Sequence, residues 1–279
     1  MKKIDTLVED IYAFLVDDNA QVEEDKVEEF TKSMVRIMTD RLSRGKQAFR
    51  LRMSNFGKPC PRALWYEKHM PEKLEPLAPY TIMKFMYGAV LEELLLFLAS
   101  CAGHKVEGMQ DQLNVHGVTG SRDAVIDGVL VDVKSANARS YKKFAFHEVP
   151  KEDSFGYMDQ LHLYLSGSKD DPLVTNKKEA AFFAVDKELG HICIDTYEFP
   201  VKDWEREVAR KKALLDQPVP PDRAFHPEPD GKSGNMQLSL ACRYCPAKKE
   251  CWPMLRTFIY SNGPRFLTTV ARVPDVKEV

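Results

Sequence analysis

The chain has 279 residues, and its 40 lysines and arginines nearly balance 42 aspartates and glutamates, so its formal net charge is −2. That length allows one large domain or two small ones, and so small a charge gives no general attraction to nucleic acids or membranes. No apolar run is long enough to span a bilayer, and Asp5, Glu9 and Asp10 interrupt any signal-peptide core. The sequence therefore predicts a cytoplasmic protein without membrane contacts, in which a polyanion site must be a local patch.

Helices and strands are expected to alternate along the chain. Periodicity near 3.6 residues predicts helices at 4–16, 22–44, 62–70, 80–102, 139–148, 154–166 and 202–216. Period-two patterns predict strands between about 104 and 135, at 180–186 and at 191–199. The final part is expected to hold a cysteine cluster, a short apolar helix and an unpatterned tail. This order predicts an α/β fold with a helical N-terminal extension at 1–49, a main domain at 50–260 and a C-terminal tail at 261–279.

Residues 123–136, DAVIDGVLVDVKSA, predict a β-hairpin. The Asp-Gly pair at 127–128 is a strong signal for a two-residue turn, and the flanks are apolar and β-branched. Counting outward from the turn places Asp123 directly opposite Asp132. One face of the hairpin is then wholly apolar, whereas the other carries both aspartates and Lys134.

Two carboxylates side by side across a pair of strands repel each other and destabilise the sheet. A solvated strand face is the structural alternative, but Lys134 on the same face favours a site. A divalent cation between Asp123 and Asp132 would turn the repulsion into binding energy, and Mg²⁺ and Mn²⁺ prefer such oxygen ligands. Lys134 beside the ion could orient an attacking water or offset charge on a phosphorane. The residues alone therefore favour a metal site.

The hairpin also carries a known pattern. Gly-Ser-Arg-Asp at 120–123 followed by Asp-Val-Lys at 132–134 resembles the GxxD and (D/E)xK motifs of the PD-(D/E)xK nuclease superfamily. The further motifs described below are similar to those of its Cas4/RecB-like branch, including the AddB and Dna2-type iron–sulfur exonucleases. The resemblance runs from about Arg50 to Trp252. It implies a restriction-endonuclease-like core, a mixed sheet flanked by helices, with a C-terminal iron–sulfur region.

The helix before the hairpin contains the first of these motifs. Glu92 and Glu93 interrupt its apolar face, and a buried acid is costly unless it is paired or bound to metal. We place Glu93 on the solvent side. Gly88 and Glu92 occupy the places of a glycine and a metal-ligating histidine in the Cas4 form, so the glutamate is a departure that other branches share. The resemblance implies four ligands for Mg²⁺ or Mn²⁺: Glu92, Asp123, Asp132 and the carbonyl of Val133.

The helix after the hairpin contains FGYMDQLHLYL at 155–165. Gln160 and Tyr164 are four residues apart and so project from one side of the helix. A plain amphipathic helix is the alternative, and His162 is expected on its surface. The QxxxY spacing is similar to the RecB-family motif that contacts the catalytic lysine and DNA. The resemblance thus implies a catalytic set of six residues: Glu92, Asp123, Asp132, Lys134, Gln160 and Tyr164.

Four cysteines form the last motif. Cys242, Cys245 and Cys251 can present three thiolates to one centre, and Cys60 is the natural fourth ligand. Zinc is one occupant of such a set. The layout of one compact triplet and a distant single cysteine resembles the iron–sulfur box of the family instead, and four thiolates suit a [4Fe–4S] cluster. Its expected role is structural, as a clamp between distant parts of the chain.

No Walker A pattern is present, so the sequence predicts no helicase motor. The resemblance implies a metal-dependent DNA exonuclease acting on single strands or duplex ends. Arg139, Lys142 and Lys143, with Tyr141 and Phe144 between them, are candidate DNA contacts, and a solvated helix face is their alternative. Two other functions stay open: a DNA-processing nuclease within a larger complex or homo-oligomer, with residues 1–49 docking a protein partner, and a catalytically silent iron–sulfur DNA-binding module.

Overall fold

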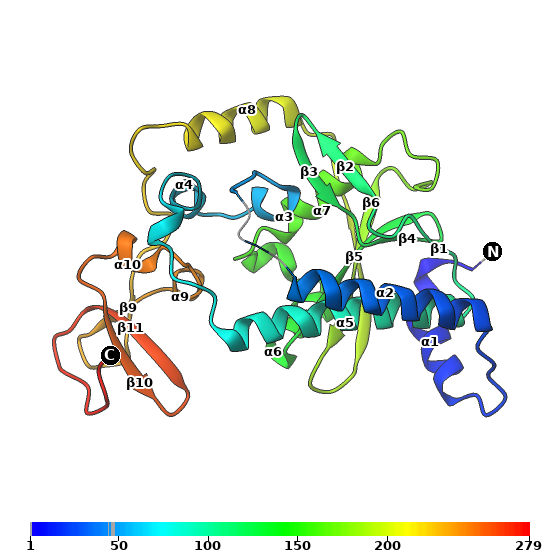
Figure 1. Cartoon of the computed structure of the whole chain (residues 1–279), viewed down its shortest axis with the longest axis horizontal. Helices are drawn as coiled ribbons and strands as arrows, with labels where there is room; N and C mark the ends of the chain where they lie inside the picture. Colours follow the sequence, from blue (N-terminus) through cyan, green and yellow to red (C-terminus); the bar gives the residue numbers. More distant parts are fainter. Residues whose placement is uncertain (1, 44, 46–47) are drawn as a thin grey trace. The chain divides into compact units, whose positions relative to one another are not determined.

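The computed structural model describes residues 2–43, 45 and 48–279, which form a mixed α/β protein (Figure 1). The chain separates into two compact units. Unit 1 consists of Met1–Gly57 and Ala78–Glu205, and unit 2 of Lys58–Leu77 and Arg206–Val279. In the part of the chain that is described, no helix combines the length and the apolar character needed to cross a bilayer.

Unit 1 is built on a mixed five-stranded sheet with the order β1-β4-β5-β6-β7. Only the β5–β6 pairing is parallel. A separate two-stranded hairpin, β2–β3, lies beside it in the sequence. The strands are β1 (Val106–Glu107), β2 (Gln112–Val115), β3 (Val118–Ser121), β4 (Ala124–Ile126), β5 (Val129–Ala136), β6 (Glu179–Asp186) and β7 (Ile192–Glu198).

Helices flank both faces of this sheet. On one face, α1 and α5 pack against the alternating apolar residues of β4, β5 and β6. On the other face, α6 and α7 both contact β5 and β6, and Phe144 of α6 meets Phe182 of β6 with ring centroids 5.4 Å apart. The helices are η1 (Ile4–Thr6), α1 (Leu7–Val16), α2 (Glu24–Leu42), α3 (Met53–Phe56), α5 (Pro79–Cys101), α6 (Ala138–Ala145), η3 (Val149–Glu152) and α7 (Tyr157–Gly167). The predicted mixed sheet flanked by helices is therefore confirmed.

The β4–β5 hairpin has the predicted register. Ile126 pairs with Val129, and Ala124 pairs with Val131. Asp127 and Gly128 form the turn, each with φ in the left-handed region, at 51° and 84°. The predicted apolar face lies in the core between the sheet and α5. The Asp-Gly turn thus sets which side chains of β5 face away from that core.

Unit 2 contains a smaller antiparallel sheet with the order β10-β11-β9-β8. Its strands are β8 (Glu228–Pro229), β9 (Met236–Gln237), β10 (Arg256–Tyr260) and β11 (Gly263–Thr269). The helices are α4 (Pro61–His69), η2 (Pro71–Lys73), α9 (Leu240–Arg243) and α10 (Lys248–Cys251), and α8 (Trp204–Leu215) leads the chain in from unit 1.

The end of the chain differs from the prediction. A hairpin of β10 and β11 stands where a short apolar helix and an unpatterned tail were expected. Phe258 and Leu267 are fully buried in this hairpin, and Gly263 has a φ of 118°, beyond the reach of most other residues. The turn consists of Ser261 and Asn262, between the paired residues Tyr260 and Gly263. The Asn-Gly dipeptide at 262–263 is a general turn signal, so the expectation of a tail was wrong for this stretch.

Candidate active site

The site lies at the start of β4, where β5 continues beyond its pairing with β4. Asp123 immediately precedes β4, and its Oδ2 accepts a hydrogen bond of 2.7 Å from the backbone N–H of Val133. The predicted rung of Asp123 and Asp132 is therefore not a strand pair, because β4 starts one residue later and the Asp123 side chain replaces a backbone partner. The carbonyl of Val133 points to the same edge of β5 as its N–H. Asp123 and this carbonyl thus share one strand edge.

Asp132 is the centre of the side-chain contacts. It is 1% exposed, and the ammonium of Lys134 forms an ion pair with its Oδ2. Gln160 of α7 donates from Nε2 to Asp132 Oδ1 at 3.3 Å and lies 3.0 Å from the hydroxyl oxygen of Tyr164. The (D/E)xK and QxxxY residues, 28 positions apart at Asp132 and Gln160, thus lie together, with Gln160 bonded to Asp132, whereas the sequence placed the QxxxY contact at the lysine.

Glu92 reaches this region from α5. Its Oε1 accepts a hydrogen bond of 2.7 Å from Nε2 of Gln110, and the Gln110 backbone N–H donates to the carbonyl of Asp123 at 3.3 Å. Gln110 therefore connects the helix of Glu92 to the strand of Asp123. It was missed in the sequence because it lies in a loop without periodicity, and no motif names it.

Burial and mutual repulsion perturb all three acids. Desolvation, with the charge of Asp132, raises the pKa of Glu92 to about 7. Burial and the charges of Glu92 and Asp132 hold the pKa of Asp123 well above its usual range, and burial also raises the pKa of Asp132. Burial opposes the charge of Lys134, but Asp132 and Asp123 raise its pKa overall. Three carboxyl groups therefore lie near Lys134, and Arg41 also acts on Glu92.

The chemical type of these ligand atoms fits a hard divalent cation. Carboxylate and carbonyl oxygens are the ligands that Mg²⁺ and Mn²⁺ prefer, and Glu92, Asp123, Asp132 and the Val133 carbonyl supply them. A divalent charge would also offset the repulsion that raises the pKa values of the acids. Within residues 2–43, 45 and 48–279, no three acidic, histidine or cysteine side chains already form a metal cradle. Binding would therefore have to draw these ligands together.

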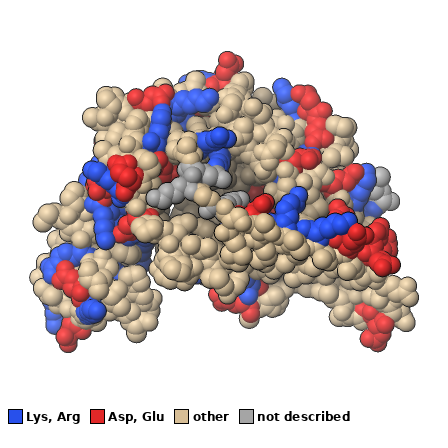
Figure 2. All heavy atoms as spheres, in the orientation of Figure 1, with Lys and Arg blue, Asp and Glu red and all other residues tan. Residues whose placement is uncertain are grey.

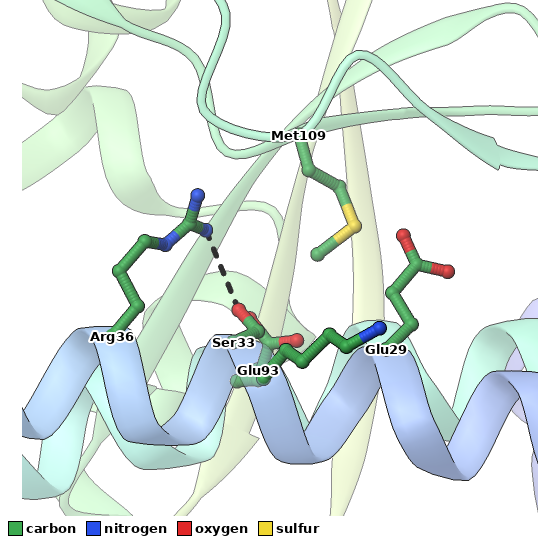
Figure 3. Close-up of a pocket in the computed structure, with 6 residues that line it drawn as sticks. Glu29, Ser33, Arg36, Glu93 and Met109 are labelled. Carbon is green, nitrogen blue, oxygen red and sulfur yellow. Dashed lines mark hydrogen bonds between the residues drawn. The ribbon is translucent and has the colours of Figure 1, made fainter.

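The expectation that Glu93 faces solvent was wrong. This residue is 6% exposed because α2 packs along this side of α5. Figure 3 shows it beside Ser33 and Arg36, at a pocket of about 270 Å³. Burial raises the pKa of Glu93, whereas its hydrogen bond with Ser33 and the charge of Arg36 oppose that rise. The helix that carries Glu92 is thus held from the far side by the N-terminal α2.

The expected surface position of His162 is also wrong. This residue of α7 is 7% exposed. Its ring stacks on Phe199 at 4.7 Å and meets Trp204 edge-on at 5.0 Å. The segment between β7 and α8 covers this side of the helix. The sequence of α7 alone does not indicate that a later segment buries His162.

The four cysteines of the predicted box all belong to unit 2 and are free thiols. Cys60 occupies the N-cap position of α4, and Cys242 and Cys251 lie in α9 and α10. Burial, together with the charges of the other three cysteines, raises the pKa of Cys245 to about 11. Burial, Cys60 and Cys251 likewise raise the pKa of Cys242. The four thiols therefore lie within electrostatic reach of one another, a donor set that fits an iron–sulfur cluster or zinc.

The predicted DNA-contact helix has a mixed outcome. Phe144 is 5% exposed and packs on Phe182, so its ring belongs to the core. Lys143 pairs with Glu152 at 2.9 Å. Figure 2 shows positive and negative side chains interspersed over the face in view, in keeping with the balanced charge. A nucleic-acid site here would depend on local geometry more than on a broad positive field.

Comparison with known proteins identifies no relative whose function could be compared with this site. No family model matches the sequence, and no curated protein matches it. Among solved structures, one titled "Crystal structure of SSO0001" aligns with 79% of this chain and 94% of its own, at 16% identity and a TM-score of 0.40. A similarity at this level assigns neither a fold nor a function.

Proposed function

We propose that the protein is a metal-dependent deoxyribonuclease of the PD-(D/E)xK superfamily, in its Cas4/RecB-like branch, acting as an exonuclease on single-stranded DNA or duplex ends. The observation that carries the proposal is the environment of Asp132. This buried carboxylate forms an ion pair with Lys134 of its own strand and accepts a hydrogen bond from Gln160 of α7. Motif residues that are distant in the sequence therefore converge on one group.

Each residue has a role in phosphodiester hydrolysis. Glu92, Asp123, Asp132 and the Val133 carbonyl would hold Mg²⁺ or Mn²⁺, which supplies an acidified water and neutralises charge on the scissile phosphate. Lys134, kept protonated by its acidic neighbours, orients the nucleophile and offers its charge to the phosphate. Gln160 holds Asp132 in place and is itself next to Tyr164.

The cysteine region of unit 2 supports the finer fold assignment. Cys60, Cys242, Cys245 and Cys251 would ligate a [4Fe–4S] cluster, with zinc as the competing occupant. Arg62 and Arg223 lie beside Cys251: Arg62 hydrogen-bonds with its side chain, and Arg223 donates to its carbonyl at 2.5 Å. Two guanidinium groups therefore contact one of the four proposed ligands.

Purified protein should be incubated with Mn²⁺ and end-labelled single strands. We expect stepwise shortening by the wild type, and its loss in Asp132→Ala and Lys134→Ala with the fold retained by circular dichroism. Lys187→Ala, which alters an exposed lysine outside the site, should cleave like the wild type.

The pattern of products separates the candidate functions. Internal fragments would mean an endonuclease and support the DNA-processing subunit, which has the same active site. Absence of cleavage by the wild type would support the silent binding module. Full activity in Asp132→Ala or Lys134→Ala would refute the assignment of the active site.

A further inference from the structure

An aromatic path leads from the proposed catalytic lysine to the surface of unit 1. Nζ of Lys134 lies 4.9 Å from the centroid of the Tyr157 ring. Tyr157 in turn stacks on Phe155, with centroids 5.5 Å apart and planes inclined by 29°. Phe155 is 46% exposed, whereas Lys134 keeps only 17% of its side-chain surface exposed. Phe155 is thus the second ring from Lys134 along this path, and it is exposed, whereas Tyr157 is half-buried.

The rings behind this path hold it in place. Tyr157 lies 6.3 Å from both Phe144 and Phe182, measured between ring centroids. Phe144 is 5% exposed and Phe182 is fully buried. Because protein interiors are close-packed, Tyr157 has no room to move inward. Phe155 therefore rests on a firm support.

The backbone around Phe155 is also constrained. The carboxylate of Asp153 accepts hydrogen bonds of 2.8 to 2.9 Å from the N–H groups of Gly156, Tyr157 and Met158 at the start of α7. Gly156 has a φ of 78°, and a Cβ there would lie 2.0 Å from the carbonyl oxygen of Gly57. These contacts restrict the turn and so lower the entropic cost of presenting Phe155 to a ligand.

We propose that Phe155 is a stacking platform for the nucleobase next to the scissile phosphate, and that this base is unpaired when it binds. The inference rests on the proposed nuclease function, which places the scissile phosphate at Lys134. Every base has an aromatic face, and stacking on a protein ring contributes about 1–3 kcal/mol per base. A base within a duplex is already stacked on both faces, so an exposed ring favours a single strand. Phe155 is a positioning residue, because it holds the strand and takes no part in the chemistry.

The test uses a single strand with one 2-aminopurine, placed in turn at each position near the end, and Ca²⁺ as the metal so that binding is measured without cleavage. Stacking on a ring quenches the fluorescence of this base. We expect wild-type protein to quench one position strongly, Phe155→Ala to lose that quenching, and Phe155→Trp to restore it. Phe146→Ala, which removes another exposed ring from the end of α6, should quench like the wild type.

Affinity gives a second readout. Phe155→Ala should bind the strand about 5- to 150-fold more weakly, the range that corresponds to one lost stacking interaction. On a strand with an abasic residue at the quenched position, Phe155→Ala and the wild type should bind equally well. A general loss of structure would weaken binding to both strands.

The outcomes distinguish the inference from the function beneath it. A wild type that cleaves DNA with Mn²⁺ but quenches no position, or a Phe155→Ala variant that quenches normally, overturns the stacking platform and leaves the nuclease in place. A wild type that quenches through Phe155 but never cleaves supports the platform and refutes the nuclease. Equal loss of affinity on normal and abasic strands also overturns the platform.

Discussion

Asp132 is the residue of the site at which the cost of burying a charge and the contacts that offset this cost meet. An ionised carboxylate that is 1% exposed lowers stability unless its partners compensate. Lys134 supplies opposite charge and Gln160 one hydrogen bond, but Glu92 and Asp123 add negative charge close by. A purely structural ion pair would gain nothing from the two extra acids. Their presence is the physical reason for proposing a cation site at this strand.

Gly120 illustrates how a residue without a side chain can support the site. An added Cβ would lie 2.9 Å from both Met53 Cβ and Tyr164 Cε1. Gly120→Ala should therefore cost about 1–3 kcal/mol of unfolding free energy through overpacking. It should also slow cleavage, because Tyr164 must shift and Gln160 moves with it. Urea unfolding and initial rates of cleavage measure the two effects.

The matched control is Gly45→Ala, because a Cβ at Gly45 meets no atom of the described residues within 4 Å. Its unfolding free energy and cleavage rate should stay at wild-type values. If Gly120→Ala were as stable and as active as Gly45→Ala, close packing at Gly120 would not be what positions Tyr164.

At the scale of elements, α7 carries two different surfaces. Gln160 and Tyr164 face β5 and the acids. His162 faces the segment that leads to α8, where it stacks on Phe199. Trp204 fixes the same segment by donating from Nε1 to Ser166 Oγ at 2.8 Å. The orientation of Gln160 therefore depends on how well the opposite side of the helix is packed.

His162 makes that packing depend on pH. Burial, reinforced by the charge of Lys202, lowers the pKa of His162 to about 4, against about 6.5 in an unfolded chain. The unfolded state binds the proton more readily, so stability is complete above pH 6.5 and falls as the pH decreases toward 4. The loss should be on the order of 2 kcal/mol. Chemical denaturation at several pH values between 4 and 7 measures it.

In His162→Gln this part of the pH dependence should disappear, whatever the stability of the variant at neutral pH. His191→Gln changes an exposed histidine between β6 and β7 and should keep the wild-type slope. An unchanged slope in His162→Gln would mean that the histidine is not neutral in the folded protein.

The sequence predicted elements whose pattern is local and missed what depends on their partners. The hairpin register followed from Asp127-Gly128, and α7 from its helical periodicity. The predicted solvent exposure of Glu93 and His162 was wrong, because the segments that cover them lie far away in the chain. Gln110 and Tyr157 carry no motif, and their place at the site depends on a loop and on ring packing. The β10–β11 turn had a local signal that was overlooked.

For the whole molecule, the path of the chain bears on the role of the cysteines. Unit 2 is made of two separate stretches, Lys58–Leu77 and Arg206–Val279, on either side of most of unit 1 in the sequence. Cys60 lies in the first stretch and the triplet in the second. A cluster held by all four would crosslink the two stretches across a long loop and lower the entropy of the unfolded chain. Unit 2 should therefore depend for stability on the cluster that we propose.

Anaerobically purified wild type should be brown, with about four irons per chain for a [4Fe–4S] cluster. Cys60→Ser should lose most of the iron and unfold at a lower temperature, because one ligand and one of the two joined stretches are released. Cys101→Ser, in α5 of unit 1, should keep iron and colour. Iron analysis, visible absorbance and thermal unfolding provide the measurements. A colourless wild type containing zinc would replace the cluster by a zinc site and weaken the family assignment, whereas full iron in Cys60→Ser would remove Cys60 from the ligand set.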